Sequence, residues 1–227
     1  MKEIFHTIFY WANARSWIRL IIAVVTIRDV AGMKNIPKKG PLILTFNHFS
    51  VGDPPIITGI FPRRIVWMAK QELFDAPLVG KLYSMGGFIS VRRFEGDLRA
   101  IRRSQEALKK GRVLGMFPEG TRSGGRLGPG EPGTALVALR TGAPILPAAI
   151  WGTENVKLPR DLFRRTRVHI RFGEPYRLPS TTRITKEHIR QATERIMHEI
   201  AGLLPPQYHG AAKGEAPADP ARVRVKK

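Results

Sequence analysis

The chain has 227 residues, which is enough for one hydrophobic core and one domain. It contains no cysteine, which excludes disulfides, thiolate catalysis and cysteine-based metal sites. Lys and Arg number 38 against 18 Asp and Glu, and the formal net charge of +20 predicts a polyanionic partner: nucleic acid, an anionic membrane, or an acidic carrier or substrate. Charge alone does not choose among these partners.

Residues 1–23 are rich in aromatic residues and isoleucine, at a spacing that predicts one or two amphipathic helices. The segment has too few consecutive apolar residues for a transmembrane helix, which needs about 20. Arg15 and Arg19 interrupt the apolar run and no small-residue cleavage site follows, which argues against a secretory signal. We expect this segment to lie in a membrane interface. The alternative is a helix packed on the protein's own core.

Between residues 24 and 204, expected strands alternate with expected helices. This order predicts an α/β domain with a mostly parallel central sheet flanked by helices. From Pro205 onward the apolar period is lost, and we expect residues 205–227 to form a disordered basic tail. The expected strands cover part of 24–36, then 41–46, 65–69, 88–91, 113–117, 144–151 and 166–172, and the expected helices cover 54–60, 76–85, 97–110, 134–141 and 185–204.

The most informative stretch follows the apolar run at 41–46. A strand buried on both faces would place Asn47 and His48 at its carboxyl end, where open α/β sheets usually place their sites. Gly52 permits a tight bend, and Asp53 before two prolines predicts the start of a helix. The Asp53 carboxylate can then fold back onto His48, fix its tautomer and make the other ring nitrogen a better base. Such a His and Asp pair also occurs by chance, so this interpretation depends on the rest of the chain.

Polar side chains also follow three other expected strands. If the strands are parallel, these side chains gather at one edge of the sheet together with the His–Asp pair. A base beside several cations suits an anionic substrate that must lose a hydroxyl proton, and an arginine can hold a phosphate with two parallel hydrogen bonds. Each cation alone is more often ordinary surface, so the combination carries the argument. The residues are Lys70, Arg92, Arg93, Glu119 and Arg122.

Other site signatures are absent from the sequence. There is no phosphate-loop motif, no His-Glu-x-x-His and no Gly-x-Ser-x-Gly. The six histidines are not spaced as metal ligands, and we expect no metal site.

From about residue 24 to 172, the chain resembles the glycerolipid acyltransferase family, with four blocks in the family's order. Residues 117–123, Phe-Pro-Glu-Gly-Thr-Arg-Ser, form the third block and are the most specific of the four. The loop at 124–133 departs from the family, because it carries Gly-Pro-Gly-Glu-Pro-Gly where members often have Lys and small residues. The other blocks are residues 47–53, 86–93 and 143–147.

The resemblance implies that His48, oriented by Asp53, is the general base. It also implies that an arginine of the second block binds the acceptor phosphate, and the family's Val-x-Arg pattern favours Arg93 over Arg92. Glu119 is expected to orient an arginine or to accept a hydrogen bond from a substrate hydroxyl. The full set expected at the substrate is Asn47, Lys70, Arg92, Arg93, Glu119, Gly120, Thr121 and Arg122.

The reaction implied by the resemblance moves a fatty acyl group from acyl-CoA or acyl-carrier protein to 1-acyl-glycerol-3-phosphate, giving phosphatidic acid without a cofactor. We expect a peripheral or monotopic protein on the cytoplasmic face of the cell membrane. One alternative is the same chemistry on another lyso-lipid, such as lyso-ornithine lipid. The other is a non-catalytic basic module that binds membrane or nucleic acid, for which His48→Ala would leave function intact. Because aromatics do not interleave with the basic clusters, we expect no nucleic-acid partner.

Overall fold

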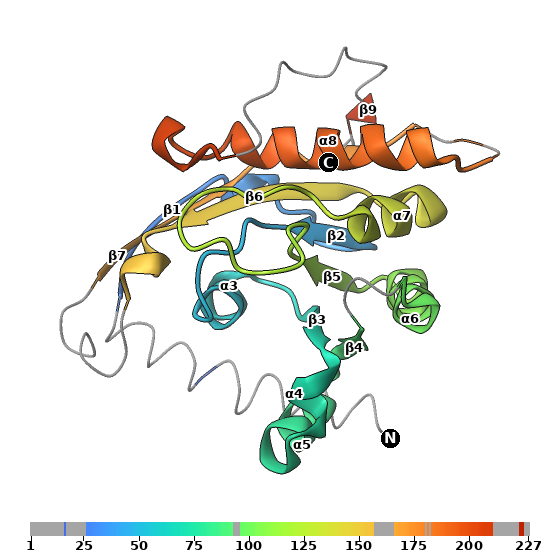
Figure 1. Cartoon of the computed structure of the whole chain (residues 1–227). Helices are drawn as coiled ribbons and strands as arrows, with labels where there is room; N and C mark the ends of the chain where they lie inside the picture. The colour runs from blue at the N-terminus through green and yellow to red at the C-terminus, as the bar shows by residue number, and fades with distance from the viewer. Residues whose placement is uncertain are drawn as a thin grey trace.

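A computed structural model describes residues 16, 26–92, 96–156, 166–179, 181, 183–210 and 223–224 of the chain (Figure 1). The expected membrane-associating segment 1–23, apart from Ser16, lies outside these residues, and so do Arg93 and most of the expected basic tail. Among the described residues, no helix has both the length and the apolar character needed to cross a membrane.

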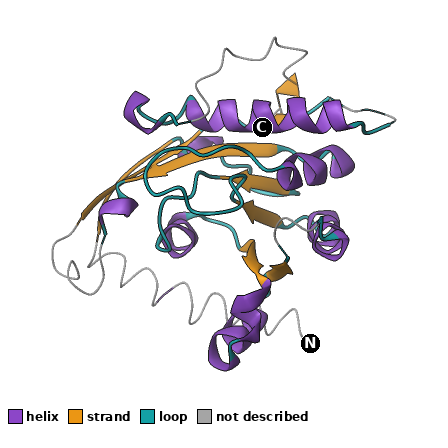
Figure 2. Cartoon of the chain, viewed as in Figure 1, coloured by secondary structure: helices purple, strands orange, loops and turns teal. Residues whose placement is uncertain are grey.

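One mixed sheet forms the centre of the molecule (Figure 2). Its main path runs in the order β1-β7-β6-β2-β5-β3-β4, and β8 joins β6 to β9. The five strands from β6 to β4 are parallel to one another, whereas β7 is antiparallel to β6 and carries β1 parallel to itself. The expected mostly parallel α/β fold is therefore confirmed. The strands are β1 Thr26–Ala31, β2 Leu42–Thr45, β3 Ile65–Lys70, β4 Ile89–Val91, β5 Val113–Met116, β6 Ile145–Trp151, β7 Thr166–Phe172, β8 Tyr176–Arg177 and β9 Val223–Arg224.

Helices cover both faces of the sheet (Figure 1). α6, α7 and α8 share one apolar core with one face, and α3 packs into a second core on the other face. The five helices expected between residues 24 and 204 occur within a few residues of their expected ends, and the short α4 was not expected. The helices are α3 Asp53–Ile60, α4 Gln71–Asp75, α5 Pro77–Gly86, α6 Leu98–Lys109, α7 Pro132–Thr141 and α8 Lys186–Ala201, with 3-10 turns at Met33–Asn35, Thr153–Asn155 and Pro206–Tyr208.

β2 lies in the middle of the parallel strands, between β6 and β5. All four of its residues are buried, and Ile43 contributes to one core while Leu42 and Leu44 contribute to the other. A strand buried on both faces needs the unbroken apolar run found here. The residues that follow β2 therefore emerge at the centre of the carboxyl edge of the sheet.

The residues after Pro205 differ from the expected disordered tail. Pro206–Tyr208 form a 3-10 turn, and the Tyr208 ring stacks on Phe49 with a centroid distance of 5.6 Å. The Tyr208 carbonyl accepts a 2.8 Å hydrogen bond from the Leu127 amide. Residues 205–210 thus belong to the folded domain. The contacts described here are made by the ring and the backbone carbonyl of Tyr208. Such contacts need no apolar period, so the sequence did not indicate that this segment is folded.

Asp97 fixes the connection between β4 and α6. Its Oδ1 accepts hydrogen bonds from the amides of Arg99 and Ala100, and its Oδ2 accepts one from the Arg92 amide. We expect Asp97→Ala to lower the free energy of unfolding by about 1 kcal/mol, because the helix loses its N-cap. Urea unfolding measures this loss. The control is Glu106→Ala on the exposed face of α6, and equal losses in the two variants would contradict the capping role.

Candidate active site

His48 and Asp53 form a buried pair at the carboxyl edge of the sheet. His48 Nδ1 lies 2.9 Å from Asp53 Oδ2. His48 is 9% exposed and Asp53 is completely buried. Because an ionised carboxylate only accepts hydrogen bonds, Nδ1 carries the ring proton and donates a hydrogen bond to Asp53. Nε2 is then left with a free lone pair, which is the arrangement that a general base needs.

The turn before α3 holds the Asp53 carboxylate in place. Besides the His48 ring, Oδ2 accepts 2.8 Å hydrogen bonds from the amides of Phe49 and Ser50. Pro54 and Pro55 stand at the first helical positions, where a missing N–H costs nothing. Asp53 Oδ1 is buried and finds no hydrogen-bond partner among the described residues. All of the polar support is therefore directed through the oxygen that faces His48.

Glu119 holds the backbone on which His48 sits. Its Oε1 accepts a 2.6 Å hydrogen bond from the His48 amide, and its Oε2 accepts a 2.7 Å hydrogen bond from the Gly128 amide. A Cβ atom at Gly128 would lie 3.0 Å from Oε2, so a side chain there would crowd the carboxylate. The Ser123 amide donates to the His48 carbonyl at 2.9 Å. These hydrogen bonds connect residues 47–53, residues 117–123 and the loop at 124–133 to one another.

This arrangement corrects the expected role of Glu119. We expected its carboxylate to orient an arginine or to bind a substrate hydroxyl. The side chain is instead buried, with its two oxygens engaged by backbone amides from different segments. Glu119 therefore positions His48 through the backbone.

Asn47 also differs from its expected place at the substrate. Its side-chain Nδ2 donates to the Ile150 carbonyl at 2.6 Å, and its Oδ1 accepts from the Ile150 amide at 2.8 Å. The side-chain amide thus pairs with the backbone of β6 two residues beyond the end of β2. Asn47 is completely buried, so its contribution is to fix the backbone just before His48.

An aromatic stack supports the His48 ring from the side. The ring lies over Phe117 with a centroid distance of 4.1 Å, and Phe117 lies over Trp67 at 5.2 Å. Trp67 is itself held by a 2.9 Å hydrogen bond from Nε1 to Thr58. A Cβ atom at Gly115 would lie 2.5 Å from the indole, so only glycine in β5 leaves room for it. Packing and hydrogen bonding together restrict the imidazole to one orientation.

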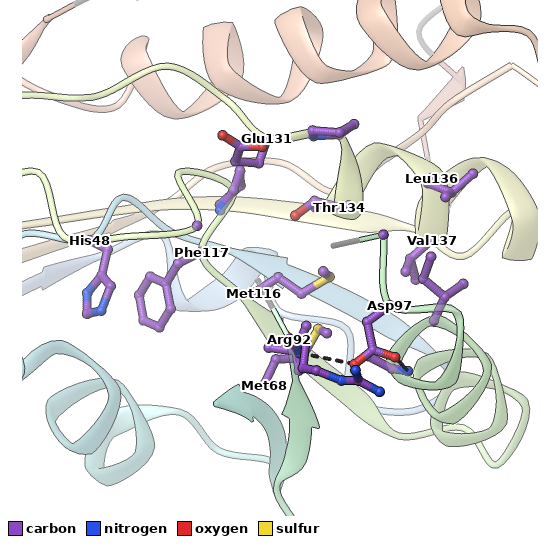
Figure 3. Close-up of a pocket in the computed structure, with 18 residues that line it drawn as sticks. His48, Met68, Arg92, Asp97, Met116, Phe117, Glu131, Thr134, Leu136 and Val137 are labelled. Atoms are coloured by element: carbon purple, nitrogen blue, oxygen red, sulfur yellow. Dashed lines mark hydrogen bonds between the residues drawn. The ribbon is translucent and has the colours of Figure 1, made fainter. Parts of the chain in front are cut away.

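A pocket of about 300 Å³ opens beside His48 (Figure 3). His48 and Phe117 lie at one end of it, and Leu136 and Val137 of α7 lie at the other (Figure 3). Arg92 and Asp97 form part of the wall near the start of α6. Most of the lining is apolar and comes from β3, β4, β5, α6 and α7: Met68, Val91, Ile101, Met116, Leu136 and Val137.

The expected substrate residues divide between this pocket and its surroundings. Arg92 and Gly120 line the pocket together with His48. Lys70 is the last residue of β3 and is half-buried, outside the lining. Thr121 and Arg122 are exposed and also lie outside it. Arg93 is outside the described residues.

Several residues of the site were not singled out from the sequence. Phe117 and Ser123 belong to the Phe-Pro-Glu-Gly-Thr-Arg-Ser block, so the motif that marked Glu119 could have marked them. Gly128 lies in the loop that departs from the family, and its glycine was the only signal. Asp97 reads as an ordinary helix cap. In the part of the chain that the structure describes, no group of three or more His, Asp or Glu side chains is arranged to hold a metal ion.

The position of Glu119 has a consequence for pH. Burial raises the pKa of Glu119 above its ordinary value of 4.5, against opposing hydrogen bonds from Ser123, Gly128 and His48. Between 4.5 and the raised pKa, the folded protein binds more protons than the unfolded chain. The free energy of unfolding should therefore fall as the pH rises through this window.

Replacement of Glu119 by Gln tests both its titration and its hydrogen bonds. The amide does not titrate, so the variant should show a flatter pH profile above pH 4.5. The NH₂ group of the glutamine would also face one of the two backbone N–H groups and cannot accept a hydrogen bond from it. This lost hydrogen bond should lower the free energy of unfolding by about 1–3 kcal/mol. Urea unfolding of both proteins across this window gives the two profiles. Parallel profiles would contradict the titration of Glu119.

The fold and the site together define a class of protein: an α/β enzyme with a buried His–Asp pair at the carboxyl edge of a mostly parallel sheet, beside an apolar pocket. Residues 27–151 match the family model described as Acyltransferase, which is more than half of the 227 residues. The chain therefore belongs to the acyltransferase family.

Individual relatives agree with this assignment. The 1-acyl-sn-glycerol-3-phosphate acyltransferase of Borreliella burgdorferi is 34% identical over 59% of this chain and 55% of its own length. The lyso-ornithine lipid O-acyltransferase of Pseudomonas aeruginosa is 31% identical over 73% of this chain and 70% of its own length. The crystal structure of the 1-acyl-sn-glycerophosphate acyltransferase PlsC from Thermotoga maritima superposes with a TM-score of 0.64 at 29% identity, covering 83% of this chain and 77% of that one. The chain spans about half the length of the first curated relatives that it matches, at 44%, 55% and 42%.

Proposed function

We propose that this chain transfers a fatty acyl group from an acyl thioester to the free hydroxyl of 1-acyl-glycerol-3-phosphate, giving phosphatidic acid. The donor is acyl-CoA or acyl-carrier protein. The observation that carries the proposal is the buried pair of His48 Nδ1 and Asp53 Oδ2 at 2.9 Å, at the end of an apolar pocket. The names of the relatives support the lysophosphatidic acid acceptor.

In this reaction His48 Nε2 takes the proton from the acceptor hydroxyl. The hydroxyl oxygen attacks the thioester carbonyl, and the tetrahedral intermediate collapses with loss of the thiolate, which takes the proton back from His48. Direct transfer needs no nucleophile from the enzyme and no cofactor, which is consistent with a chain that has no cysteine. A general base accounts for about 10²–10⁴-fold of the rate, so positioning of the two substrates must supply much of the rest.

The pocket supports a fatty acyl chain as its occupant. Its wall is formed mainly by aliphatic side chains and methionines, and Met residues adapt readily to flexible ligands. An acyl chain laid along it would bring its carbonyl to the His48 end, where the hydroxyl is activated. The lining thus suits the apolar part of either substrate.

The acceptor phosphate needs cations close to the His48 end. Arg92 lines the pocket, and its guanidinium can hold a phosphate with two hydrogen bonds. Lys70 is the last residue of β3, and Arg122 lies in the segment that follows β5, six residues after Met116. We assign these three, together with Arg93, to the phosphate. Gly120 and Thr121 belong to the same segment as Arg122.

A second candidate acceptor is a lyso-ornithine lipid, because a relative named for that reaction is 31% identical over 70% of its own length. The acceptors differ in their head groups, so the specificity constant kcat/KM separates them. We expect the highest value for 1-acyl-glycerol-3-phosphate, a lower one for lyso-ornithine lipid, and the lowest for 1-acylglycerol, which lacks the phosphate. A higher value for lyso-ornithine lipid would replace the proposed acceptor by the second one.

We further propose that the protein acts as a peripheral or monotopic protein on the cytoplasmic face of the cell membrane, with residues 1–23 as a membrane-associating segment. The net charge of +20 suits an anionic leaflet. Deletion of residues 1–23 should release the protein from membranes while leaving the sheet folded. Sedimentation with membranes and circular dichroism measure the two effects, and an unchanged membrane fraction would count against this segment.

A further inference from the structure

One helix of the domain, α5, is fixed to its neighbours by a single face. Gly80 packs so closely on α4 that a Cβ atom there would lie 2.0 Å from the Phe74 carbonyl oxygen. On the same side, the Tyr83 ring contacts Phe74 at 5.8 Å and Phe88 at 4.6 Å between centroids. These contacts determine how α5 is rotated about its own axis.

Away from these contacts, α5 exposes large apolar side chains. Leu78 is 85% exposed, Leu82 is 55% exposed and Val79 is 38% exposed. The spacing i, i+1 and i+4 places the three on one face of the helix. Single exposed leucines are common, but adjacent ones on a rigid helix mark an interaction site.

This apolar face lies on the flank of the sheet that carries the candidate active site. α4 begins directly after the last residue of β3, and α5 begins two residues after α4 ends. β3 and β2 are separated only by β5, so at about 4.8 Å per strand their ends are roughly 10 Å apart. Figure 1 shows α4 and α5 projecting from the sheet beside β3 and β4. The first turn of α5, with Leu78, is therefore near the carboxyl edge of the sheet, which also carries His48.

We propose that α5 is a membrane-contact helix, whose Leu78, Val79 and Leu82 enter the interface of an anionic lipid bilayer. Three side chains are far too few for a stable protein interface, which needs about 800 Å² from each partner. A bilayer interface, in contrast, accepts a helix face buried by about 5–10 Å. The inference goes beyond the proposed reaction and does not depend on which lyso-lipid is the acceptor.

The attraction to anionic lipid comes from the chain as a whole. Its net charge is +20, and α6, the next helix after α5, exposes Arg99, Arg102 and Arg103. α5 itself contributes the exposed Lys81, whereas the neighbouring α4 carries Glu72 and Asp75. Basic residues outside α5 thus supply most of the electrostatic attraction, and the apolar face of α5 adds an insertion to that of the proposed membrane-associating segment 1–23.

A single fluorescent label tests the contact directly. Because the chain has no cysteine, Leu82→Cys provides one thiol for an environment-sensitive nitrobenzoxadiazole label on the otherwise complete chain. Met33→Cys is the matched control, since Met33 is 40% exposed. Met33 follows β1, and β1 runs antiparallel to the central strands. Met33 therefore lies at the edge of the sheet opposite to the edge that carries His48. Vesicles of phosphatidylglycerol and phosphatidylcholine in equal parts provide the membrane, and co-sedimentation reports binding separately.

We expect the emission of the label at position 82 to shift to the blue when the protein binds vesicles, with severalfold less quenching by aqueous iodide. The label at position 33 should not respond. A label at position 82 that remains in water on vesicle-bound protein would overturn the proposal, and so would a protein that does not sediment with the vesicles. Equal binding to vesicles of phosphatidylcholine alone would overturn the requirement for anionic lipid.

A double substitution provides a second measurement that does not depend on a label. Leu78→Ser with Leu82→Ser should weaken partition into the mixed vesicles by about tenfold or more, because two leucines no longer leave water. Met33→Ser should leave partition unchanged. All three positions are exposed, so circular dichroism should show folded protein for both variants. Equal partition of the double variant and the wild type would contradict insertion of α5.

Discussion

Replacement of His48 by Ala is expected to lower kcat by about 10²–10⁴-fold, which is the usual contribution of a general base. KM for the acyl donor should change little, because the ring lies at one end of the apolar pocket and makes up little of its wall. The physical reason is that Nε2 is the one ring nitrogen free to take a proton, since Nδ1 is engaged by Asp53 at 2.9 Å. Steady-state rates of thiol release with saturating acceptor measure the effect.

The chain provides a matched control for this substitution. His169 Nδ1 lies 3.0 Å from Asp29 Oδ2, so the molecule has a second His–Asp pair of similar geometry. That pair joins β7 to β1, is partly exposed and is not part of the pocket lining. His169→Ala should leave kcat within about twofold of the wild type, in line with the small effects of surface substitutions. Equal losses in the two variants would contradict the assignment of His48 as the base.

Replacement of Asp53 by Asn is expected to lower both activity and stability. The amide keeps the size of the carboxylate, but it no longer stabilises His48 when the ring takes up a proton. We therefore expect kcat to fall by about 10²-fold or more. The free energy of unfolding should fall by about 1–3 kcal/mol, because a neutral amide oxygen is a weaker acceptor for the three hydrogen bonds that Oδ2 accepts, and because the NH₂ group would be buried in the place of Oδ1, which has no partner among the described residues.

Two measurements separate these effects of Asp53. Urea unfolding gives the stability loss, and kcat measured on the folded variant gives the catalytic loss. Asp29→Asn in the surface pair is the control and should change neither by much, because the exposed carboxylate is solvated. An Asp53→Asn protein with wild-type kcat would show that the carboxylate has only a structural role.

Much of the fold could be predicted from local sequence. The apolar run at 41–46 indicated a strand buried on both faces, and Asp53 before two prolines indicated the start of α3 within one residue. The direction of β7 could not be predicted, because pairing direction depends on contacts between distant segments. α4 was missed because five residues after a strand leave no room for a helical apolar period.

The pair at the centre of the site was also predictable, since His48 and Asp53 are five residues apart and one turn brings them together. The role of Glu119 was not predictable in this way. Its partners, the amides of His48 and Gly128, are backbone groups, and the His48 amide lies 71 residues away in the sequence. A sequence motif indicates which side chains matter, but backbone partners are visible only in the folded structure. Asn47 was misplaced for the same reason, because its partner is the backbone of Ile150.

The most direct test of the account is whether thioester cleavage by the purified chain depends on the acceptor. Palmitoyl-CoA and 1-acyl-glycerol-3-phosphate in mixed micelles provide the substrates, free thiol reports cleavage, and mass spectrometry identifies the lipid product. We expect thiol release that requires the acceptor, with phosphatidic acid formed in equal amount. Thiol release at the same rate without acceptor would mean that water is the true acceptor and would contradict acyl transfer by this site.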